Sequence, residues 1–584
     1  MNDRTPPGRD PHAVLHPGPD GAPRLTDERH VVVVGGGIAG IAAAVVLAER
    51  GARVTLVEAC EQLGGRVRAW PTQDGRTMSR GFHAFFRQYY TLRALLRRVD
   101  PELDHLVPVP DYPLRRGDGL TDSFAKLPAT PPANLVTFVL RSPTFPVSAL
   151  PSVHIPSALE LVNVSYPESH ERYDGESAQD FLDRLRFPDG ARHLALEVFA
   201  RSFFARPPER VRRRGAGRDV PHLLHRLLRG PALRRAGRRL RHRPVGAAGA
   251  LPVRARGADP HRRAAGEQVA PPSGYAAQPA GPDGTADGGD DGGDDGGAWT
   301  VRTDAGELTA DAVVLATDPR ATRALVADLP VSQDRTLGRA QRSWHERLAA
   351  GRNAPPFVVL RLWCDGLVAP SREAFLGTSG YDLLDNVTVL ERFEQGAADW
   401  SAEHGGSVVE LHGYAVDPHR DPDVAGGGRG GLDEERVRAR LLASLHQVYP
   451  ETAELESVHE ELVVEDDCGL VGTGPWRQRP TVDTPYPGLA LAGDGLRVDW
   501  PIALMERAAV TGVLAANHLL QGWGVRGEDV WTVPLEGILR RRPHLPAAVR
   551  DGAATVPGLL RDGATRVPAA LRRGAARVPG LRGR

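Results

Sequence analysis

The sequence contains very little lysine and cysteine. Lys126 is the only lysine among 73 basic residues, so arginine is common everywhere and one arginine is weak evidence for a binding site. The three cysteines, Cys60, Cys364 and Cys468, are far apart and form no C-x-x-C pair. This spacing argues against a disulfide framework, a zinc ribbon or an iron–sulfur cluster. We therefore expect no metal site and a reducing, cytoplasmic location.

Neither sign of charge is in excess. The 73 basic residues are balanced by 73 acidic ones, so no net charge attracts nucleic acid, and we expect no nucleic-acid partner. Residues 1–28 lack the apolar stretch of a secretory signal and are predicted to form a disordered tail. The uncharged stretch from Val31 to Ala48 is long enough for a marginal membrane span, but its glycines favour another structure.

A strand, a tight turn and a helix are predicted near the N-terminus. Val31–Val34 is a β-branched run too short for a helix, and an alanine-rich helix pattern continues to Glu49. Between them, Gly35 permits the turn, Gly37 lets the backbone approach a pyrophosphate, and Gly40 lets helix and strand pack closely. The start of such a helix attracts phosphate, so the pattern predicts a dinucleotide site. A glycine-rich buried helix or a membrane span is the alternative.

A second strand, Arg53–Val57, ends at Glu58, whose carboxylate can hold a ribose hydroxyl. This fingerprint alone does not separate NAD from FAD. The residues from Glu58 to Arg66 resemble the glycine-doublet-plus-arginine motif of amine oxidases, protoporphyrinogen oxidases and carotenoid desaturases. Gly64 and Gly65 let the chain pass close beside a cofactor, and Arg66 supplies a planar cation for phosphate or flavin oxygens. Those families use FAD, so the resemblance implies FAD here.

A late segment repeats the order of strand, acid and helix. The apolar run Pro487–Ala492 leads to Gly493 and Asp494. A helix pattern then opens at Pro501 and continues past Glu506. In the flavoproteins that this segment resembles, the aspartate accepts a ribityl hydroxyl and the helix start points at the flavin pyrimidine. The resemblance gives these cofactor-binding roles to the Gly493–Asp494 pair and to the helix near Glu506.

A third piece is expected between these two. It is the strand Asp311–Thr317, which follows a hairpin around Trp299–Leu308. Together the pieces predict an α/β fold, in which a discontinuous, Rossmann-like FAD-binding domain is interleaved with an α+β substrate domain.

Aromatic residues are concentrated just after the cofactor motif, although the sequence is only 6% aromatic. Five lie within nine positions: Phe82, Phe85, Phe86, Tyr89 and Tyr90. With His83 among them, this run is similar to that of isorenieratene-synthase-type β-carotene desaturase/methyltransferases. The likeness covers about residues 30–205 and 299–533. It implies an aromatic-walled tunnel for a carotenoid, and aromatisation of β-carotene rings by hydride removal to FAD, methyl migration and proton loss.

His83 is the candidate base for the released proton, and the alternative that it only packs beside the cofactor stays open. Three other functions stay open: desaturation of a linear carotene, amine or porphyrinogen oxidation, and a degenerate flavin fold without cofactor. The apolar, proline-broken stretch 135–150 predicts either a buried helix or peripheral contact with the inner face of the membrane. The oligomeric state is not indicated.

One segment departs from the family pattern. Residues 206–263 hold 18 arginines, three acids and no aromatic residue, a composition that cannot form an ordinary core. We predict a low-complexity or out-of-frame segment here, and an RNA-binding arm is less favoured. The expected order is a disordered tail (1–28), FAD-binding domain (29–125), substrate domain (126–205), the departing segment (206–298), FAD-binding domain (299–330), substrate domain (331–480), FAD-binding domain (481–523) and a basic tail (524–584).

Overall fold

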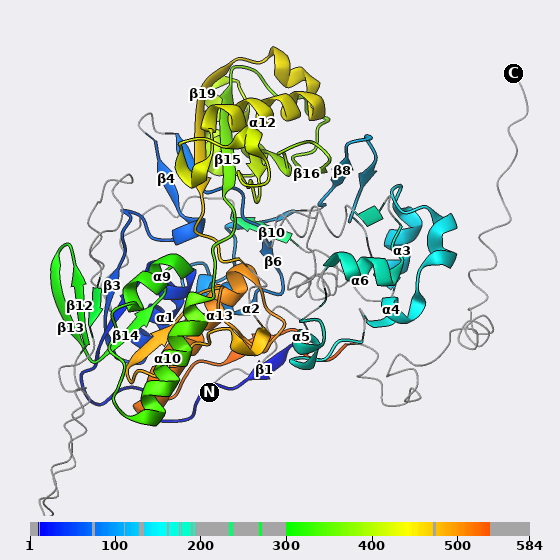
Figure 1. Cartoon of the computed structure of the whole chain (residues 1–584). Coiled ribbons are helices and arrows are strands. Elements are labelled where there is room, and N and C mark those ends of the chain that lie inside the picture. The colour runs from blue at the N-terminus through cyan, green and yellow to red at the C-terminus, as the bar shows by residue number, and fades with distance from the viewer. Residues whose placement is uncertain are drawn as a thin grey trace, which may run out of the picture.

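The computed structural model describes residues 10–192, 233–236, 268–270 and 299–537, apart from short gaps at 11, 73–75, 110, 126, 128–132, 161–162, 175, 177, 189–190 and 471–474. Two main sheets organise these residues, each with helices around it (Figure 1). Most of the segment 206–298 and the whole tail after 537 lie outside the described residues, so the predictions made for them are not addressed by the structure.

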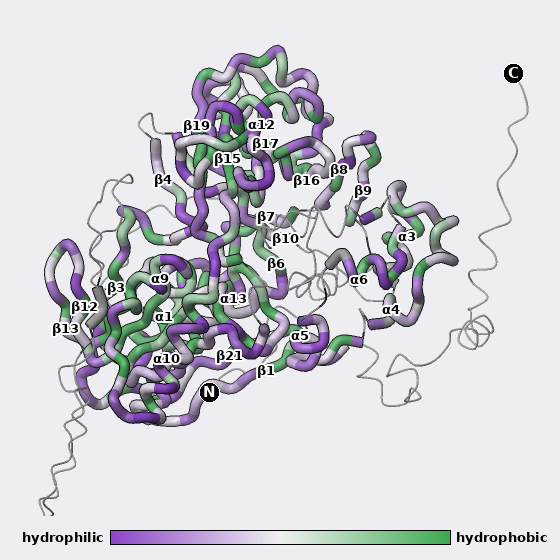
Figure 2. Tube along the Cα trace, viewed as in Figure 1, coloured by the Kyte–Doolittle hydropathy of each residue, from purple (hydrophilic) through white to green (hydrophobic). Residues whose placement is uncertain are grey.

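A four-stranded parallel sheet forms one body of the molecule. Its order is β20-β14-β2-β3, with bounds Leu489–Leu491, Ala312–Leu315, His30–Val34 and Arg53–Val57. Its central strands are buried throughout, so helices must cover both faces. Helices α1 (Ile38–Glu49) and α13 (Leu504–Gly522) lie against the sheet and against each other. They approach so closely that a Cβ on Gly512 would lie 2.1 Å from the carbonyl oxygen of Ala39. Figure 2 shows the hydrophobic residues gathered along α1 and the strands beside it.

The predicted strands and hairpin of this body are confirmed. The hairpin consists of β12 (Trp299–Thr303) and β13 (Gly306–Ala310), and it leads directly into β14. Strand β11 (Gln268–Ala270) pairs with the edge of β12 opposite to β13. Helices α9 (Pro319–Val326) and α10 (Arg335–Ala349) follow, and both begin with an aspartate side chain that accepts backbone N–H groups.

A seven-stranded mixed sheet forms the second body, drawn at the top of Figure 1. Its order is β19-β15-β18-β17-β16-β8-β9, with bounds Ser457–Glu465, Phe357–Cys364, Val408–Gly413, Asn386–Val389, Phe375–Ser379, Leu114–Arg116 and Thr121–Asp122. Alternate residues of the central strands, such as Leu360 and Leu411, pack with α12 (Glu434–Val448). The residues between them face the opposite side, which places Arg361, Glu410 and His412 on one face.

Smaller elements join the two bodies or extend from them. The strands are β1 (Val14–His16), β4 (Ala69–Pro71), β5 (Thr77–Ser79), β6 (Phe85–Phe86), β7 (Leu106–Val109), β10 (Leu233–Ala236) and β21 (Val530–Thr532). The helices are α2 (Tyr90–Leu96), α3 (Ala133–Arg141), α4 (Ile155–Glu160), α5 (Glu168–Arg172), α6 (Ala178–Leu185) and α11 (Gln395–His404). Helices α3, α4 and α6 form a separate lobe in Figure 1.

Several expected domain limits differ from the structure. Residues 12–28 and 524–537 are not tails, because β1 pairs with β21 and ties both segments to the body of the parallel sheet. Strands β8 and β9 belong to the seven-stranded sheet, although the sequence pattern assigned them to the first domain. Helix α10 packs into the core of the parallel sheet through Trp344 and Leu348, although it was expected in the second domain. Strand pairing and apolar packing set these limits, and local sequence patterns do not reveal either.

Candidate active site

The glycine loop after β2 lies in the wall of a large cavity. Gly35 has a φ of +104°, and a Cβ there would lie 2.6 Å from the carbonyl oxygen of Ala316. A Cβ on Gly40 would lie 1.9 Å from the carbonyl oxygen of Gly35, so Gly40 serves close packing, as expected. Gly37 lines the cavity and precedes α1, whose first turn has no side-chain cap and no acidic residue. The helix start is therefore open to an anion.

Glu58 lies on the cavity wall at the end of β3. Its two carboxylate oxygens accept the backbone N–H groups of Gly36, at 2.6 Å, and of Cys60, at 3.0 Å. The carboxylate thus holds the glycine loop in place from the position where a ribose hydroxyl was predicted to bind.

The glycine doublet, Gly64 and Gly65, packs against the glycine loop that follows β2. The N–H of Gly64 donates to the carbonyl oxygen of Gly36 at 2.8 Å, and a Cβ on Gly65 would lie 3.0 Å from the Cα of Gly37. Both residues of the doublet have positive φ values, which a side chain would strain. The close approach predicted for this motif is therefore an approach to the first glycine loop as well as to the cavity.

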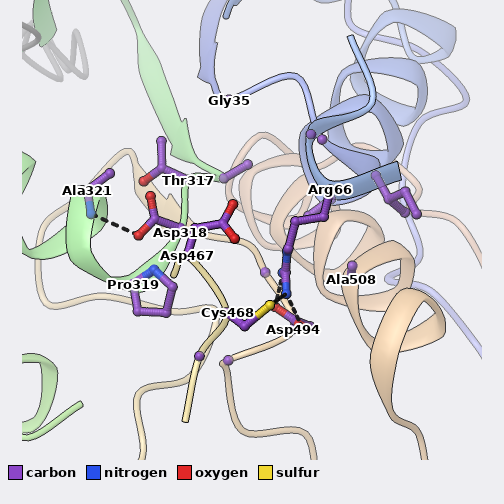
Figure 3. A pocket seen from close by; sticks show the side chains of 18 of the residues that line it. Gly35, Arg66, Thr317, Asp318, Pro319, Ala321, Asp467, Cys468, Asp494 and Ala508 are labelled. Atoms are coloured by element: carbon purple, nitrogen blue, oxygen red, sulfur yellow. Dashed lines mark hydrogen bonds and ion pairs between the residues drawn. The ribbon is translucent and has the colours of Figure 1, made fainter. Parts of the chain in front are cut away.

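Arg66 joins the early and late segments of the chain. Its guanidinium donates to both carboxylate oxygens of Asp494, at 2.5 and 3.1 Å, and one nitrogen lies 3.7 Å from the sulfur of Cys468 (Figure 3). Burial alone would raise the pKa of the Asp494 carboxyl, but the Arg66 charge outweighs burial and the pKa lies below its usual value. The same pairing raises the pKa of Arg66. Both side chains line the cavity.

The end of β20 and the start of α13 complete this wall. Gly493 has a φ of +148°, and its N–H donates to the hydroxyl of Thr511 at 2.9 Å. The first residues of α13, including Met505 and Ala508, line the cavity. Glu506 does not. It is fully buried, and its carboxylate accepts the N–H groups at the start of α2 at 2.8 and 3.0 Å.

The Glu506 side chain therefore does not line the cavity, and the cofactor-binding prediction made near it rests on the start of the helix. Successive helix residues point about 100° apart, so a helix start at the cavity does not place each of its side chains there. The helix start reaches the cavity, as expected, while the Glu506 side chain points to α2.

The cavity has a volume of about 2240 Å³ and continues from the glycine loop to the aromatic segment. Its far part is lined by residues of that segment and of the seven-stranded sheet: Phe82, His83, Phe86, Tyr89, Tyr112, Phe375, Asn386, His412 and Tyr414. The volume exceeds that of an ordinary single-ligand pocket of about 300–1,000 Å³, so a dinucleotide and a second ligand can share it.

His83 lies on the cavity wall beside the seven-stranded sheet. Its Nδ1 lies 2.6 Å from the carbonyl oxygen of Gly81, which can only accept, so Nδ1 carries the proton and Nε2 keeps its lone pair. Burial lowers the pKa of His83 from 6.5 to about 4. The imidazole is therefore neutral at neutral pH, as a proton acceptor must be.

Sequence reasoning missed a polar cluster next to His83. Arg361 and Glu410 are almost completely buried and form an ion pair with a nitrogen–oxygen distance of 2.5 Å. Glu410 also contacts His412, whose Nδ1 lies 2.6 Å from the hydroxyl of Tyr414. A signal was available, because a charged residue interrupts each of two largely apolar strands, β15 and β18.

Comparison with known proteins gives the family. A family model for flavin containing amine oxidoreductase matches residues 38–213 and 290–520. The carotenoid phi-ring synthase of Streptomyces griseus is 46% identical over 91% of this chain and 96% of its own length. The chain belongs to the flavin-containing amine oxidoreductases, in the carotenoid phi-ring synthase group. The part of the chain between the two matched ranges lies inside the departing segment 206–298.

Other relatives agree with this membership. The carotenoid phi-ring synthase of Chlorobaculum tepidum is 26% identical over 88% of this chain and 92% of its own length. Among solved structures, putrescine oxidase bound to putrescine gives a TM-score of 0.54 at 14% identity, covering 85% of this chain and 100% of that one. Cyclohexylamine oxidase from Brevibacterium oxydans gives 0.51 at 14% identity, covering 86% and 100%. At such identities the structures show the shared fold.

Two further features concern the predicted absence of a metal site and the predicted membrane contact. Within the described ranges, no group of three or more histidine, cysteine, aspartate or glutamate side chains is arranged to hold a metal ion. In the same part of the chain, none of the helices combines the length and the apolar character needed to cross a bilayer.

Proposed function

We propose that this chain is an FAD-dependent carotenoid oxidoreductase that aromatises β-carotene rings with migration of one methyl group. The observation that carries this proposal is the 46% identity with the Streptomyces griseus carotenoid phi-ring synthase, spread over 91% of this chain. A likeness of that extent includes the substrate side as well as the cofactor motif. Amine oxidation has weaker support, because the amine oxidase structures share the fold at only 14% identity.

In this proposal the parallel sheet and its helices form the FAD-binding domain, and the seven-stranded sheet belongs to the substrate domain. The N–H groups around Gly37 at the start of α1 bind the pyrophosphate, and Glu58 accepts a ribose hydroxyl. Arg66 supplies charge for phosphate or flavin oxygens, while Asp494 accepts a ribityl hydroxyl. The close approach of Gly65 to Gly37 supports this assignment, because a side chain on Gly65 would crowd the glycine loop. When bound, FAD supplies a two-electron oxidation by accepting hydride.

The aromatic part of the cavity holds the carotenoid ring and excludes water. Phe82 packs against Phe375 and Phe393 with ring centroids 5.0 and 5.9 Å apart, and Tyr112 packs against Phe375 at 4.6 Å. Such walls offer apolar contact without a charge, which suits a hydrocarbon. A dry cavity also protects the cation that hydride removal leaves on the ring. Carotenoids reside in membranes, and the exposed Leu140 on α3 accords with peripheral membrane contact.

His83 is the proposed proton acceptor on this side of the cavity. Nε2 carries the lone pair, and a weak base suffices because a ring cation is a very strong acid. Asp385 directly precedes β17 and Glu391 lies in the turn after it, but their carboxylates are engaged by backbone N–H groups. His83 is therefore the side chain whose replacement tests the assignment.

The experiment is the conversion of β-carotene by the full chain reconstituted with FAD. We expect products with aromatic rings, identified by visible absorption and mass, and a flavin spectrum in the purified protein. His83→Ala is expected to keep the flavin spectrum and to lower the turnover rate about a hundredfold or more. Failure of the wild type to aromatise β-carotene, with a linear carotene consumed instead, would identify a different desaturase. Full activity of His83→Ala would remove His83 from the mechanism.

A further inference from the structure

A line of hydrogen bonds leads from the cavity into the seven-stranded sheet. Tyr414 and His412 both line the cavity, and the hydroxyl of Tyr414 lies 2.6 Å from Nδ1 of His412. Nε2 of His412 lies 2.8 Å from an oxygen of Glu410, a carboxylate with no exposed surface. The other oxygen of Glu410 accepts from Arg361 at 2.5 and 3.0 Å.

The charges fix where the protons lie in this line. Burial would raise the pKa of Glu410, but Arg361 and His412 lower it far below its usual value, so the carboxylate is ionised. An ionised oxygen only accepts, so Nε2 of His412 carries a proton and donates it to Glu410. In the neutral imidazole, Nδ1 then holds a lone pair and accepts from the Tyr414 hydroxyl. The amide nitrogen of Asn386 donates to that hydroxyl oxygen at 3.0 Å.

This line of hydrogen bonds is suited to accept a proton as well as to support the fold. Aromatising one β-ring removes two hydrides and two protons, so a second acceptor spares the first base a proton exchange with solvent between the two proton losses. His83 takes only one proton before it is charged. Burial raises the pKa of Tyr414 far above its usual value, so its hydroxyl cannot end as tyrosinate. A proton that reaches Tyr414 must therefore continue to His412, where the Glu410 carboxylate lies ready to stabilise an imidazolium.

We propose that Tyr414 and His412 form a proton relay, positioned by Glu410 and Arg361, that accepts one of the protons released by the substrate ring. This proposal rests on the proposed function. In the step, a ring C–H bond of the substrate cation breaks and its electron pair becomes a ring double bond. The proton passes to the oxygen of Tyr414, whose own proton moves to Nδ1 of His412. The substrate becomes neutral, and His412 becomes an imidazolium paired with Glu410.

Other titratable groups face this relay. Tyr112 and His83 come from the first part of the chain. Tyr112 helps to raise the pKa of Tyr414, and His412 helps to lower the pKa of His83. Asp385, on the segment before β17, accepts the N–H of Tyr414 at 2.6 Å. A pH profile therefore reports on the whole group, and the decisive measurements are those that follow the transferred proton itself.

The test uses Tyr414→Phe and His412→Gln in the FAD-loaded full chain with β-carotene. Both variants are expected to bind flavin and carotenoid normally, as read from absorption spectra, and to bleach the flavin at the wild-type rate in anaerobic mixing. Formation of aromatic product should fall about a hundredfold, and the solvent deuterium isotope effect of that step should disappear. His412→Ala should regain part of its activity when free imidazole is added, which a merely structural defect would not.

Tyr449→Phe is the matched control. Tyr449 is fully buried, donates its hydroxyl to the carbonyl oxygen of Glu373 at 2.8 Å and does not line the cavity. The Tyr449→Phe variant should retain the wild-type turnover rate and the wild-type solvent deuterium isotope effect. Wild-type turnover in Tyr414→Phe or His412→Gln would overturn the relay while leaving the proposed function intact. A wild-type chain that leaves β-carotene unchanged would overturn both. If Tyr414→Phe does not fold, His412→Gln decides alone.

Discussion

Two arginine–carboxylate pairs, one beside the parallel sheet and one in the seven-stranded sheet, are built differently. Arg66 and Asp494, on the cofactor side, join segments more than four hundred residues apart and keep side-chain exposures of 33% and 22%. Arg361 and Glu410, on the substrate side, have exposures of 1% and 0%. The first pair lies in the cavity wall, whereas the second is enclosed by the sheet and the segments packed on it.

The difference lies in what else each arginine binds. Arg361 also donates to the carbonyl oxygen of Thr77 at 2.6 Å and to the hydroxyl of Ser79 at 2.7 Å. Glu410 accepts the N–H of Phe82 at 2.7 Å, so the pair holds the backbone on both sides of the bend at residues 80–81, just before His83. A buried pair with this many partners fixes a structure, while a pair that faces a cavity can exchange partners with a ligand.

The largest effect is expected when the enclosed pair is broken. Arg361→Met leaves the Glu410 carboxylate buried without its counter-ion, which costs about 3–5 kcal/mol of the free energy of unfolding. Denaturant unfolding of the flavin-loaded protein measures this loss. Arg438→Met is the control, because its pair with Glu460 is exposed by 39% and 32% and should contribute less than about 1 kcal/mol. Equal losses in both variants would contradict the comparison.

The partly exposed pair should matter for the cofactor more than for stability. Asp494→Asn removes the charge that faces Arg66 and weakens the acceptor proposed for the ribityl hydroxyl. We expect flavin to bind about tenfold to a hundredfold more weakly, which corresponds to about 1.4–2.8 kcal/mol. Titration of the apoprotein with FAD measures the affinity, and unfolding of the apoprotein should change by less than about 1 kcal/mol. A stability loss as large as that of Arg361→Met would show that this pair is structural too.

The cofactor side of this comparison could be predicted from the sequence, whereas the Arg361–Glu410 pair on the substrate side could not. The glycine loop, Glu58 and the Gly–Asp strand end were predictable because backbone conformation and strand-to-helix order constrain them locally. The Arg361–Glu410 pair was hidden because strand pairing joins residues that are far apart in sequence. The direction of the Glu506 side chain was hidden for a related reason, since only the packed structure shows which way a helix residue points.

Low pH should lower the stability of the folded protein through His83. Burial lowers the pKa of His83 from 6.5 to about 4, so the unfolded chain binds a proton that the folded chain does not. Stability therefore falls as pH drops from about 6.5 and the loss levels off below about pH 4. We expect His83→Asn to lose less stability over this window, by about 1–2 kcal/mol. The control is a parallel titration of the wild type, because other buried histidines, such as His30, contribute in both proteins. Identical pH curves would show that His83 is solvated.

Replacement by lysine separates the two arginines, and Arg66→Lys has the smallest expected effect. Lysine keeps the charge but presents one ammonium group instead of a planar fork. Arg66→Lys should weaken flavin binding by less than tenfold and change the stability by less than about 1 kcal/mol, because one ammonium can still reach Asp494 or a phosphate.

Arg361→Lys is the matched variant for this change. An ammonium at that position cannot serve Glu410, Thr77 and Ser79 together, so a larger loss is expected, of about 1–3 kcal/mol. Unfolding and FAD titration of both variants measure the difference. If Lys is tolerated better at 361 than at 66, the enclosed pair depends on charge alone and the backbone contacts of Arg361 contribute little to the bend just before His83.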